Sequence, residues 1–493
     1  MDVRIERLGP DQVDSPWLAV GVFEDQVGPP AGLEANVLGV LVGRLLESKD
    51  LGTAVGEVSL LHGDWSMPAR SAALVGLGTK AAFNAGAAFS AGVALGKKLA
   101  GRKRDRIALA LPGEGLAPSI ISAWVEGFIV GTRGPGLHKS EPSRHEPGEL
   151  IVAVPAGSLA DADLTLAVER GRTVGWAMNL ARDLVNTPPA EKPPHILADR
   201  AKVLAEEAGL EVEVWGEARL EDERFGGLLA VAAGSDEPPA FVRISYRKGG
   251  EDPVLALVGK GVTFDSGGLS LKPSSSMEDM KSDMTGSAVV LATVLAASKL
   301  GLKVNVDAYL AVTENMTGGR AMKLGDVLTM RNGKTVEVMN TDAEGRLILA
   351  DALSYVAEQK PARVIDLATL TGACMVALGT KYAGLFSNDD ALANDVLAAS
   401  KATGERAWRL PLDEDFKELF KSPVADLKNV GGKWGGAITA AKFLEQFVGG
   451  VPWVHLDIAG PSWADNDSAT RDCGGTGCFV RTLVTLLETS AKG

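Results

Sequence analysis

The sequence predicts an α/β protein with a smaller N-terminal α/β domain, a connecting helix and a larger C-terminal α/β domain that has a mixed central sheet. Short apolar runs typical of buried strands alternate with runs of helical periodicity along the chain. A long helical run over residues 163–185 ends at Asn186-Thr-Pro-Pro189, and beyond it the strand–helix–strand pattern repeats. We therefore place the N-terminal domain in residues 1–162, the connecting helix in 163–185 and the C-terminal domain in 186–493.

In the N-terminal domain, apolar runs predict strands and an alanine-rich stretch predicts a helix. The strands are expected over residues 18–23, 73–77, 107–111 and 150–154, and the helix over residues 81–99. Gly76-x-Gly78-x-x-Ala81 has the spacing of a dinucleotide-binding fingerprint, but basic residues stand where that motif needs an acidic one about 20 positions later. We interpret it as a tight turn. Residues 133–149, which include His138 and His145, predict an exposed loop.

The C-terminal domain alternates predicted strands and helices. Strands are expected over residues 211–215, 240–246, 254–258, 304–312 and 363–368, and helices over residues 194–208, 286–300 and 347–359. Residues 325–339 predict a hairpin that turns at Asn332-Gly333, because that dipeptide favours two-residue hairpin turns.

Composition bounds the class of protein. A hydrophobic content of 46% and a charged content of 23% are ordinary for a globular protein, and 493 residues suffice for two or three domains. The net charge of −13 disfavours nucleic acid as a partner. We find no apolar run long enough to span a membrane and no signal-peptide layout at the N-terminus. Three cysteines, Cys374, Cys473 and Cys478, are too few for a disulfide framework, so we expect free thiols and a cytoplasmic location.

The stretch Asn340–Leu347 carries three charged side chains at alternate positions, just before a predicted helix. In an extended turn, Asp342 and Glu344 share one side of the chain and can converge on one point, where a divalent cation would hold them. An alternative is a capping box formed by Thr341 and Glu344 at an ordinary helix start. The motif alone does not decide between these two interpretations.

A second charged segment follows the predicted strand 254–258. It contains Lys260, Asp265, Lys272 and Asp283. Ligands of open α/β sheets bind beyond the carboxyl ends of the strands, so we expect these side chains to line one crevice with Asp342, Glu344 and Arg346. A buried salt-bridge network is the alternative, but burying so many charges is a weak way to stabilise a fold. The second segment therefore favours a site.

Other hydrolytic chemistries find less support in the sequence. Asp265-Ser-Gly-Gly268 has the residues that surround the nucleophile of trypsin-like proteases, but none of the five histidines stands in the context of a catalytic base. There is no His-Glu-x-x-His motif and no phosphate-binding loop. Metals in this protein would therefore be held by carboxylates and an amine. We interpret His455 as a structural histidine and Cys374 as a small buried apolar residue.

Four segments together resemble the leucine aminopeptidase family, the cytosol aminopeptidases with two metal ions. They are Lys260–Asp283, Asn340–Leu347, Asp366–Cys374 and His455–Gly460. The octapeptide at 340–347 is highly specific to that family. The resemblance implies a cytosolic hydrolase that releases N-terminal amino acids, of a broad leucine type, from peptides through a water that bridges two metal ions. It also implies a homohexamer that acts on peptides with a free N-terminus.

The resemblance assigns a role to each candidate residue. It implies metal ligation by Lys260, Asp265, Asp283, Asp342 and Glu344, with Asp265 and Glu344 shared by two divalent ions, manganese or zinc. Lys272 would stabilise the developing oxyanion as an electrophile, and Arg346 would hold a bicarbonate that acts as general base. The pocket for the first side chain is implied at Met280, Thr369, Leu370, Gly372 and Ala459.

Two positions depart from the family pattern. Ser462 stands where some members have methionine, so the resemblance does not fix a preference for leucine. Thr285 replaces a glycine in the usual Asp-Met-Gly-Gly, which suggests an altered backbone there. Two other hypotheses are a DNA-binding regulator, a second role of some bacterial relatives, and a scaffold without activity. The acidic net charge speaks against the first, and the complete set of charged residues against the second.

Overall fold

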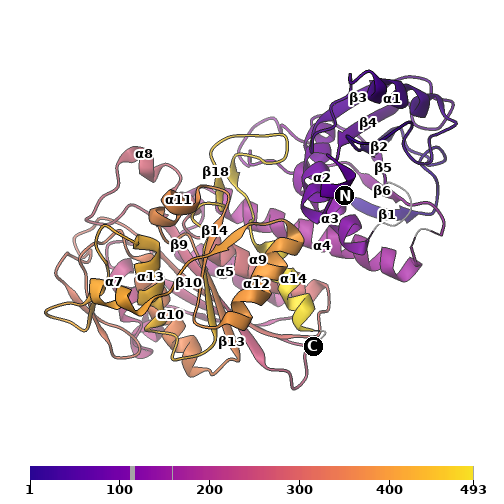
Figure 1. Cartoon of the computed structure of the whole chain (residues 1–493). Helices are drawn as coiled ribbons and strands as arrows, with labels where there is room; N and C mark the ends of the chain where they lie inside the picture. The colour runs from indigo at the N-terminus through magenta and orange to yellow at the C-terminus, as the bar shows by residue number, and fades with distance from the viewer. Residues whose placement is uncertain (112–116, 158, 492–493) are drawn as a thin grey trace. The chain divides into compact units, whose positions relative to one another are not determined.

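The computed structural model describes residues 1–111, 117–157 and 159–491. It divides into two compact units, of which the first comprises Met1–Asn179, Ala402–Gly404 and Asp465–Cys473, and the second comprises the remainder. Both units interleave helices with strands, which confirms the predicted α/β fold class (Figure 1). The domain boundaries proposed from the sequence stay a prediction. No helix in the described ranges is both long and apolar enough to cross a bilayer.

The first unit is a six-stranded sheet with helices on both faces. The strand order is β1 (Asp2–Glu6), β6 (Glu149–Ala153), β5 (Arg106–Ala110), β2 (Trp17–Val22), β4 (Ser71–Gly76) and β3 (Val58–His62). All neighbouring strands are parallel except β3 and β4. The helices of this unit are α1 (Val37–Glu47), α2 (Ala85–Ala100), α3 (Pro118–Thr132) and the first part of α4 (Asp161–Asn186), with a 3₁₀ turn η1 at Lys80–Ala82.

Alternate residues of β2 enter different hydrophobic cores. Ala19 packs with residues of α2 and α3, whereas Leu18 and Val20 pack with residues of α1. This alternation is the period of two that a strand imposes on its side chains. The predicted tight turn after β4 is present, since Gly78 has a φ of +70° and α2 begins only at Ala85.

The second unit is built on an eight-stranded mixed sheet. Its order is β15 (Ala407–Arg409), β14 (Ala383–Ser387), β17 (Trp453–Asp457), β13 (Arg363–Ala368), β9 (Val254–Asp265), β10 (Asn305–Asn315), β8 (Ala240–Arg247) and β7 (Glu211–Trp215). The four central strands β17, β13, β9 and β10 are parallel, and β14, β8 and β7 each run antiparallel to an inner neighbour. The carboxyl ends of the parallel strands therefore meet at one edge.

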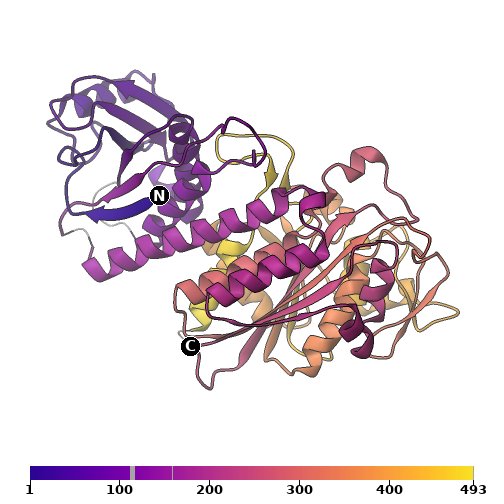
Figure 2. The same ribbon diagram turned by 180° about the vertical axis from the view of Figure 1, so that it is seen from behind.

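Helices cover both faces of this sheet. Helices α5 (Pro194–Glu207) and α9 (Thr285–Lys299) contact strands on one face, and α5 is seen in front of the sheet in Figure 2. Helices α7 (Gly226–Ala232), α10 (Gly345–Glu358) and α13 (Gly436–Glu445) share a large aromatic and aliphatic core on the other face. The other helices are α6 (Glu217–Asp222), α8 (Ser274–Met277), α11 (Gly372–Leu378), α12 (Asp390–Thr403) and α14 (Val480–Ser490), with 3₁₀ turns η2 (Pro189–Glu191), η3 (Met280–Ser282) and η4 (Glu414–Phe420).

Two small sheets complete the unit. One joins β11 (Val327–Thr329), β12 (Thr335–Glu337) and β16 (Leu427–Lys428), and the other pairs β18 (Trp463–Ala464) with β19 (Gly474–Gly475). Strands β11 and β12 are antiparallel, and Gly333 between them has a φ of +87°. The hairpin predicted at Asn332-Gly333 is therefore confirmed.

One strand is longer than the sequence predicted. The prediction ended a strand at Val258 and placed Lys260 after it, but β9 continues to Asp265. The run that follows Val258 contains Gly259 and Gly261, which normally weaken a strand. Here the absence of a side chain is needed, because a Cβ on Gly259 would lie 2.6 Å from the Ser287 backbone in α9. The close approach of α9 keeps this segment in the sheet.

Candidate metal centre and active site

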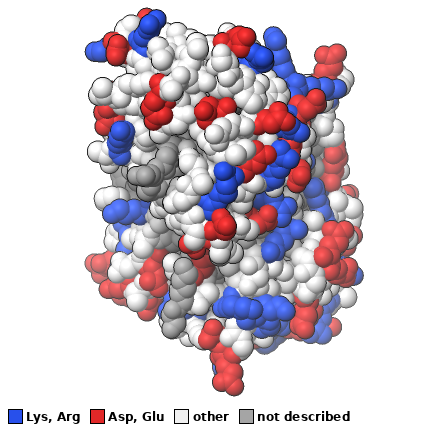
Figure 3. Space-filling view, turned by 90° about the vertical axis from the view of Figure 1, so that its right-hand side faces the viewer, with Lys and Arg blue, Asp and Glu red and all other residues white. Residues whose placement is uncertain are grey.

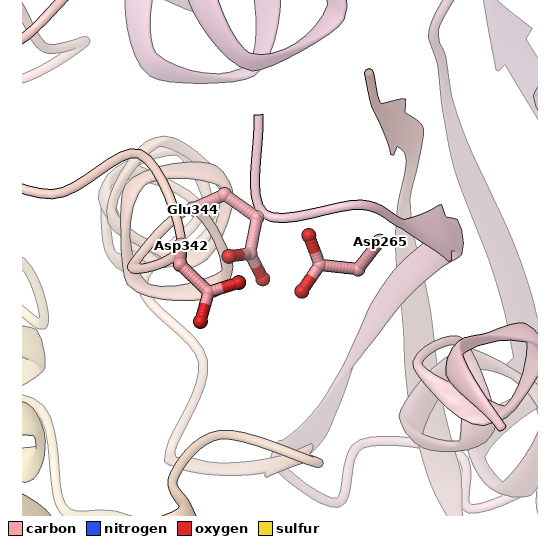
Figure 4. Close-up of side chains that lie close together, drawn as sticks. All are labelled: Asp265, Asp342 and Glu344. Atoms are coloured by element: carbon pink, nitrogen blue, oxygen red, sulfur yellow. The ribbon is translucent and has the colours of Figure 1, made fainter. Parts of the chain in front are cut away.

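Six charged side chains from three separate segments converge at the carboxyl end of β9. They are Lys260 and Asp265 on β9, Lys272 in the loop after it, Asp283 after η3, and Asp342 and Glu344 in the turn before α10. The nearest carboxylate oxygens of Asp265, Asp342 and Glu344 all lie within 4.8 Å of one another (Figure 4). We call Lys260, Asp265, Asp283, Asp342 and Glu344 the ligand cluster. The convergence expected from the two sequence segments is thus present.

The two lysines pair with different carboxylates. Lys260 Nζ lies 2.8 Å from Asp283 Oδ1 and 2.8 Å from Glu344 Oε1. Lys272 Nζ lies 2.9 Å from Asp265 Oδ2 and also pairs with Asp342. Lys260 therefore joins β9 to the Asp283 segment and to the turn before α10. Lys272 joins the end of β9 to the same turn.

The turn before α10 is not a capping box. Helix α10 begins at Gly345, and no side chain caps it from the preceding Glu344. The Thr341 hydroxyl instead donates to the Gly267 carbonyl at 2.6 Å. Any side chain in place of Gly345 would displace the Lys260 side chain, because a Cβ there would lie 2.6 Å from Lys260 Nζ. The capping interpretation is therefore wrong, because tertiary contacts with the β9 loop hold this turn.

Burial and crowding shape the electrostatics of the ligand cluster. Burial, with the Glu344 charge adding to it, raises the pKa of Asp265 to about 6. Burial likewise raises the pKa of Asp283. Burial opposes the charge of Lys260, but Asp283 and Glu344 outweigh it and raise the pKa of its amine. Carboxylates packed this closely favour an added positive charge.

The unfilled oxygens of the cluster test whether divalent metal ions fit. Asp283 Oδ2 and Glu344 Oε2 are buried, and within the described part of the chain neither accepts a hydrogen bond. Buried polar atoms of this kind require an explanation, such as a bound ion. Carboxylate oxygens and an amine nitrogen are suitable donors for manganese or zinc. The residues present therefore fit such ions.

Arg346 lies in the first turn of α10. Its Nη1 donates to the Asn429 carbonyl at 2.7 Å, while its Nε has no hydrogen-bond partner among the described residues. Burial lowers the pKa of this guanidinium to about 10, against the charge of Glu344. The guanidinium is thus held through Nη1, and its Nε remains available as a donor.

Most of the predicted pocket residues lie beside the ligand cluster. The Thr369 hydroxyl donates to Asp283 Oδ1 at 2.7 Å, and Lys260 Nζ donates to the Thr369 carbonyl at 3.0 Å. Met280 begins η3, and its carbonyl accepts the Asp283 N–H. Leu370 and Gly372 follow Thr369 in the same turn, which leads into α11.

Ala459 lies after β17, the neighbour of β13 in the sheet. Its N–H and that of Leu370 both donate to Asp457. Asp457 therefore accepts hydrogen bonds from two turns, the one after β13 and the one after β17.

The two positions that depart from the family pattern are accommodated without strain. Thr285 is the first residue of α9, and its hydroxyl donates to the Ser282 carbonyl. The altered backbone suggested by the sequence is not needed, since Thr285 is not among the residues with positive φ. Ser462 is buried, and its hydroxyl donates to the Ala459 carbonyl at 3.2 Å.

Sequence reasoning missed residues that hold the site in place. Asn315, at the end of β10, donates to Asp265 Oδ1 at 2.8 Å and to the Thr341 carbonyl at 3.0 Å. Asn429 donates to the Asn340 carbonyl in addition to binding Arg346. The place of Asn315 at the carboxyl end of a parallel strand was a usable signal, whereas nothing local marks Asn429.

The buried His455 is a structural histidine, as interpreted from the sequence. Its Nδ1 lies 2.6 Å from Asp366 Oδ1, and its ring stacks against Phe386 and Trp453. Cys374 is also buried, as expected.

The DNA-binding hypothesis requires a basic surface. On the face shown in Figure 3, Lys and Arg side chains are interspersed with Asp and Glu side chains. The described part of that face has no broad basic patch.

Comparisons with known proteins agree with this geometry. The family model described as "Cytosol aminopeptidase family, catalytic domain" matches residues 179–484, and "Cytosol aminopeptidase family, N-terminal domain" matches residues 19–132. A probable cytosol aminopeptidase of Solibacter usitatus is 43% identical over 488 residues, which cover 99% of each chain. The chain belongs to the cytosol aminopeptidase family.

Other members of the cytosol aminopeptidase family are similarly close. A probable cytosol aminopeptidase of Rhodopirellula baltica is 47% identical over 85% of this chain and 81% of its own length. The solved structure of the "Bottromycin maturation enzyme BotP in complex with Mn" has a TM-score of 0.85 and 37% identity, and covers 97% of this chain and 100% of its own. As a member of this family, the protein is a metal-dependent aminopeptidase.

Proposed function

We propose that this aminopeptidase acts in the cytoplasm and releases N-terminal residues, of a broad leucine type, from peptides with a free α-amine. The observation that carries the proposal is the meeting of the five residues of the ligand cluster, from three segments, around buried carboxylate oxygens that no described residue supplies with a donor. A similar enzyme has been solved in complex with manganese, which supports a metal-dependent activity for this chain.

The ligand cluster would hold two divalent cations, manganese or zinc. Asp265 and Glu344 would be shared between them, Asp342 would complete one site, and Lys260 and Asp283 the other. The cations would supply Lewis-acid activation of a water and of the scissile carbonyl, together with a place for the free α-amine of the substrate. Lys260 must donate the lone pair of a neutral amine, because metal ligands bind in their deprotonated form.

Two cationic side chains would act on the substrate. Lys272, at the less buried edge of the site, would stabilise negative charge on the carbonyl oxygen as it develops. Arg346 would use its free donor to hold bicarbonate, which supplies a general base. Together they make histidine unnecessary in proton transfer.

The substrate pocket and the assembly are also part of the proposal. Met280, Thr369, Leu370, Gly372 and Ala459 would surround the first side chain. We also propose that the protein assembles as a homohexamer. Light scattering of the purified protein measures its mass directly.

The test uses purified protein loaded with Mn²⁺ or Zn²⁺. Wild type should release leucine from leucine amide and from peptides with a free N-terminus, and should leave N-acetylated peptides intact. Asp342→Ala should abolish release and lower the metal content while the circular dichroism spectrum is unchanged. Asp326→Ala is the matched control, because Asp326 is an acidic residue of a surface loop that pairs with Lys323. Turnover by Asp342→Ala at the wild-type rate would refute the assignment.

The bicarbonate role has a separate test. In bicarbonate-depleted buffer, adding bicarbonate should raise the wild-type rate and should leave the rate of Arg346→Ala unchanged. An equal response of both proteins would remove Arg346 from this role without affecting the metal assignment.

A further inference from the structure

Asp457, the last residue of β17, is a buried carboxylate outside the ligand cluster whose two oxygens are both used. Oδ1 accepts the N–H of Leu370 at 3.2 Å and the N–H of Ala459 at 3.2 Å. Oδ2 accepts the Thr371 hydroxyl at 2.6 Å. The side chain is fully buried. A carboxylate is tolerated there because each oxygen has donors.

The donors belong to two different turns. Leu370 and Thr371 follow β13, and Ala459 follows β17, the adjacent parallel strand. Each turn contributes residues to the proposed pocket for the first side chain of the substrate. One carboxylate therefore ties the two walls of that pocket together.

The turn after β13 is anchored separately at its other end. Thr369 binds Lys260 through its carbonyl and Asp283 through its hydroxyl. The turn is thus fixed to the ligand cluster at Thr369 and to Asp457 at Leu370 and Thr371. Removing the second anchor leaves the first in place.

Thr371 also connects Asp457 to the start of α11. Its hydroxyl oxygen accepts the Cys374 N–H at 3.0 Å, so it caps the start of that helix while it donates to Asp457. Asp457 therefore fixes the direction in which the turn enters α11, as well as the turn itself.

We propose that Asp457 is a positioning residue that sets the separation of the two pocket walls and thereby the preference for the first side chain of the substrate. The inference rests on the proposed aminopeptidase function. Asp457 acts through Leu370, Thr371 and Ala459. A large first side chain contacts both walls, whereas alanine is too short to do so. Loosening one wall therefore weakens binding of large residues more than binding of alanine.

The experiment compares variants that disturb or keep the hydrogen bond between Thr371 and Asp457. Thr371→Val removes the hydroxyl with little change in shape, Thr371→Ser keeps the hydroxyl, and Asp457→Asn removes the charge while Thr371 can still cap α11. For each, kcat and KM are measured with alanine, leucine and phenylalanine amides at saturating Mn²⁺. Mn²⁺ affinity is measured by calorimetry on the same samples.

Thr371→Val and Asp457→Asn should each lower the leucine-to-alanine ratio of kcat/KM about fivefold, the effect of about one hydrogen bond, and mainly through KM. Thr371→Ser should keep the wild-type ratio, and Mn²⁺ affinity should not change in any variant. The double variant Asp457→Asn/Thr371→Val should shift the ratio by less than the two single changes combined, because both disturb the hydrogen bond between Thr371 and Asp457. Asp307→Asn, a buried aspartate at the opposite end of the sheet, should leave the ratio unchanged.

Three results would overturn the inference: equal losses for all three amides, additive effects in the double variant, or a Thr371→Ser that behaves as Thr371→Val. If Asp457→Asn does not fold, the Thr371 pair still decides the matter. Failure of the proposed function is distinguishable, because wild type would then release no amino acid from any amide.

Discussion

Two buried carboxylates, one just before α10 and one in the middle of it, have different surroundings. Asp351, in the middle of the helix, accepts the N–H groups of Gly227 and Leu228 on one oxygen and that of Arg331 on the other. Glu344, just before the helix, pairs with Lys260 through one oxygen, and the other accepts no hydrogen bond from the described residues. The first carboxylate is saturated by the backbone, and the second is not.

The comparison shows which property marks a site. Burial raises the pKa of Asp351 to about 7, and burial with the charge of Glu344 raises that of Asp265 to about 6. A raised pKa is therefore common to both places. What separates the ligand cluster is that its carboxylates crowd one another and leave buried oxygens without donors. This difference predicts a metal-dependent function for the carboxylates before α10 and a structural role for Asp351 in the middle of the helix.

The largest expected effect is the loss of activity in Glu344→Gln. Removing this charge should lower kcat/KM for leucine amide by at least about 100-fold. The unfolding free energy of the metal-free protein should fall only slightly, because the ion pair between Glu344 and the buried Lys260 is lost while the repulsion between Glu344 and both Asp265 and Asp283 is relieved. Urea unfolding after chelation measures this. A large loss of stability with retained activity would make Glu344 a structural residue like Asp351.

Asp351→Ala should show the opposite behaviour. It leaves three buried N–H groups without an acceptor, so the unfolding free energy should fall by about 3 kcal/mol. The kcat of the folded fraction should remain that of wild type. Ser354→Ala on the same helix is the control, because the Ser354 hydroxyl donates only to a carbonyl of its own helix and its loss should change stability by less than about 1 kcal/mol. A drop in kcat with Asp351→Ala would contradict the assignment of a purely structural role to Asp351.

Metal addition should then separate the two variants. A ligand that binds only the folded state at 100 times its Kd adds about 2.7 kcal/mol to the unfolding free energy. Mn²⁺ should give this increase to wild type and to Asp351→Ala, and should not give it to Glu344→Gln. Thermal unfolding with and without Mn²⁺ measures the increase. An equal increase in all three proteins would place the metal away from the ligand cluster.

The convergence of the cluster followed from local sequence rules. Parallel strands end at one edge of a sheet, so charged residues after β9 and before α10 were expected to meet there. The fold class and the hairpin at Asn332-Gly333 were predicted correctly because period and turn chemistry are local signals. The roles of the individual site residues stay predictions.

The errors share a cause, which is long-range packing. Helix α9 holds Gly259 in the sheet, and the Gly267 carbonyl takes the hydroxyl that was expected to cap α10. Asp457 was overlooked because two of its partners, Leu370 and Thr371, lie more than 80 positions away. Periodicity within a segment carries no information about such contacts.

The smallest effect is a pH dependence of stability confined to Asp351. Its folded pKa, about 7, is above its ordinary value of 3.8 because burial disfavours the charge. A group of this kind contributes stability that is fully present below the ordinary pKa and is lost as pH rises through the folded pKa. Between about pH 5 and about pH 6, the unfolding free energy of metal-free wild type should therefore fall by about 1.4 kcal/mol relative to Asp351→Asn, in which this position does not titrate. Parallel urea titrations of the two proteins measure the difference. A constant difference across this range would mean that the N–H groups of Gly227, Leu228 and Arg331 keep Asp351 ionised throughout, and backbone saturation would then outweigh burial.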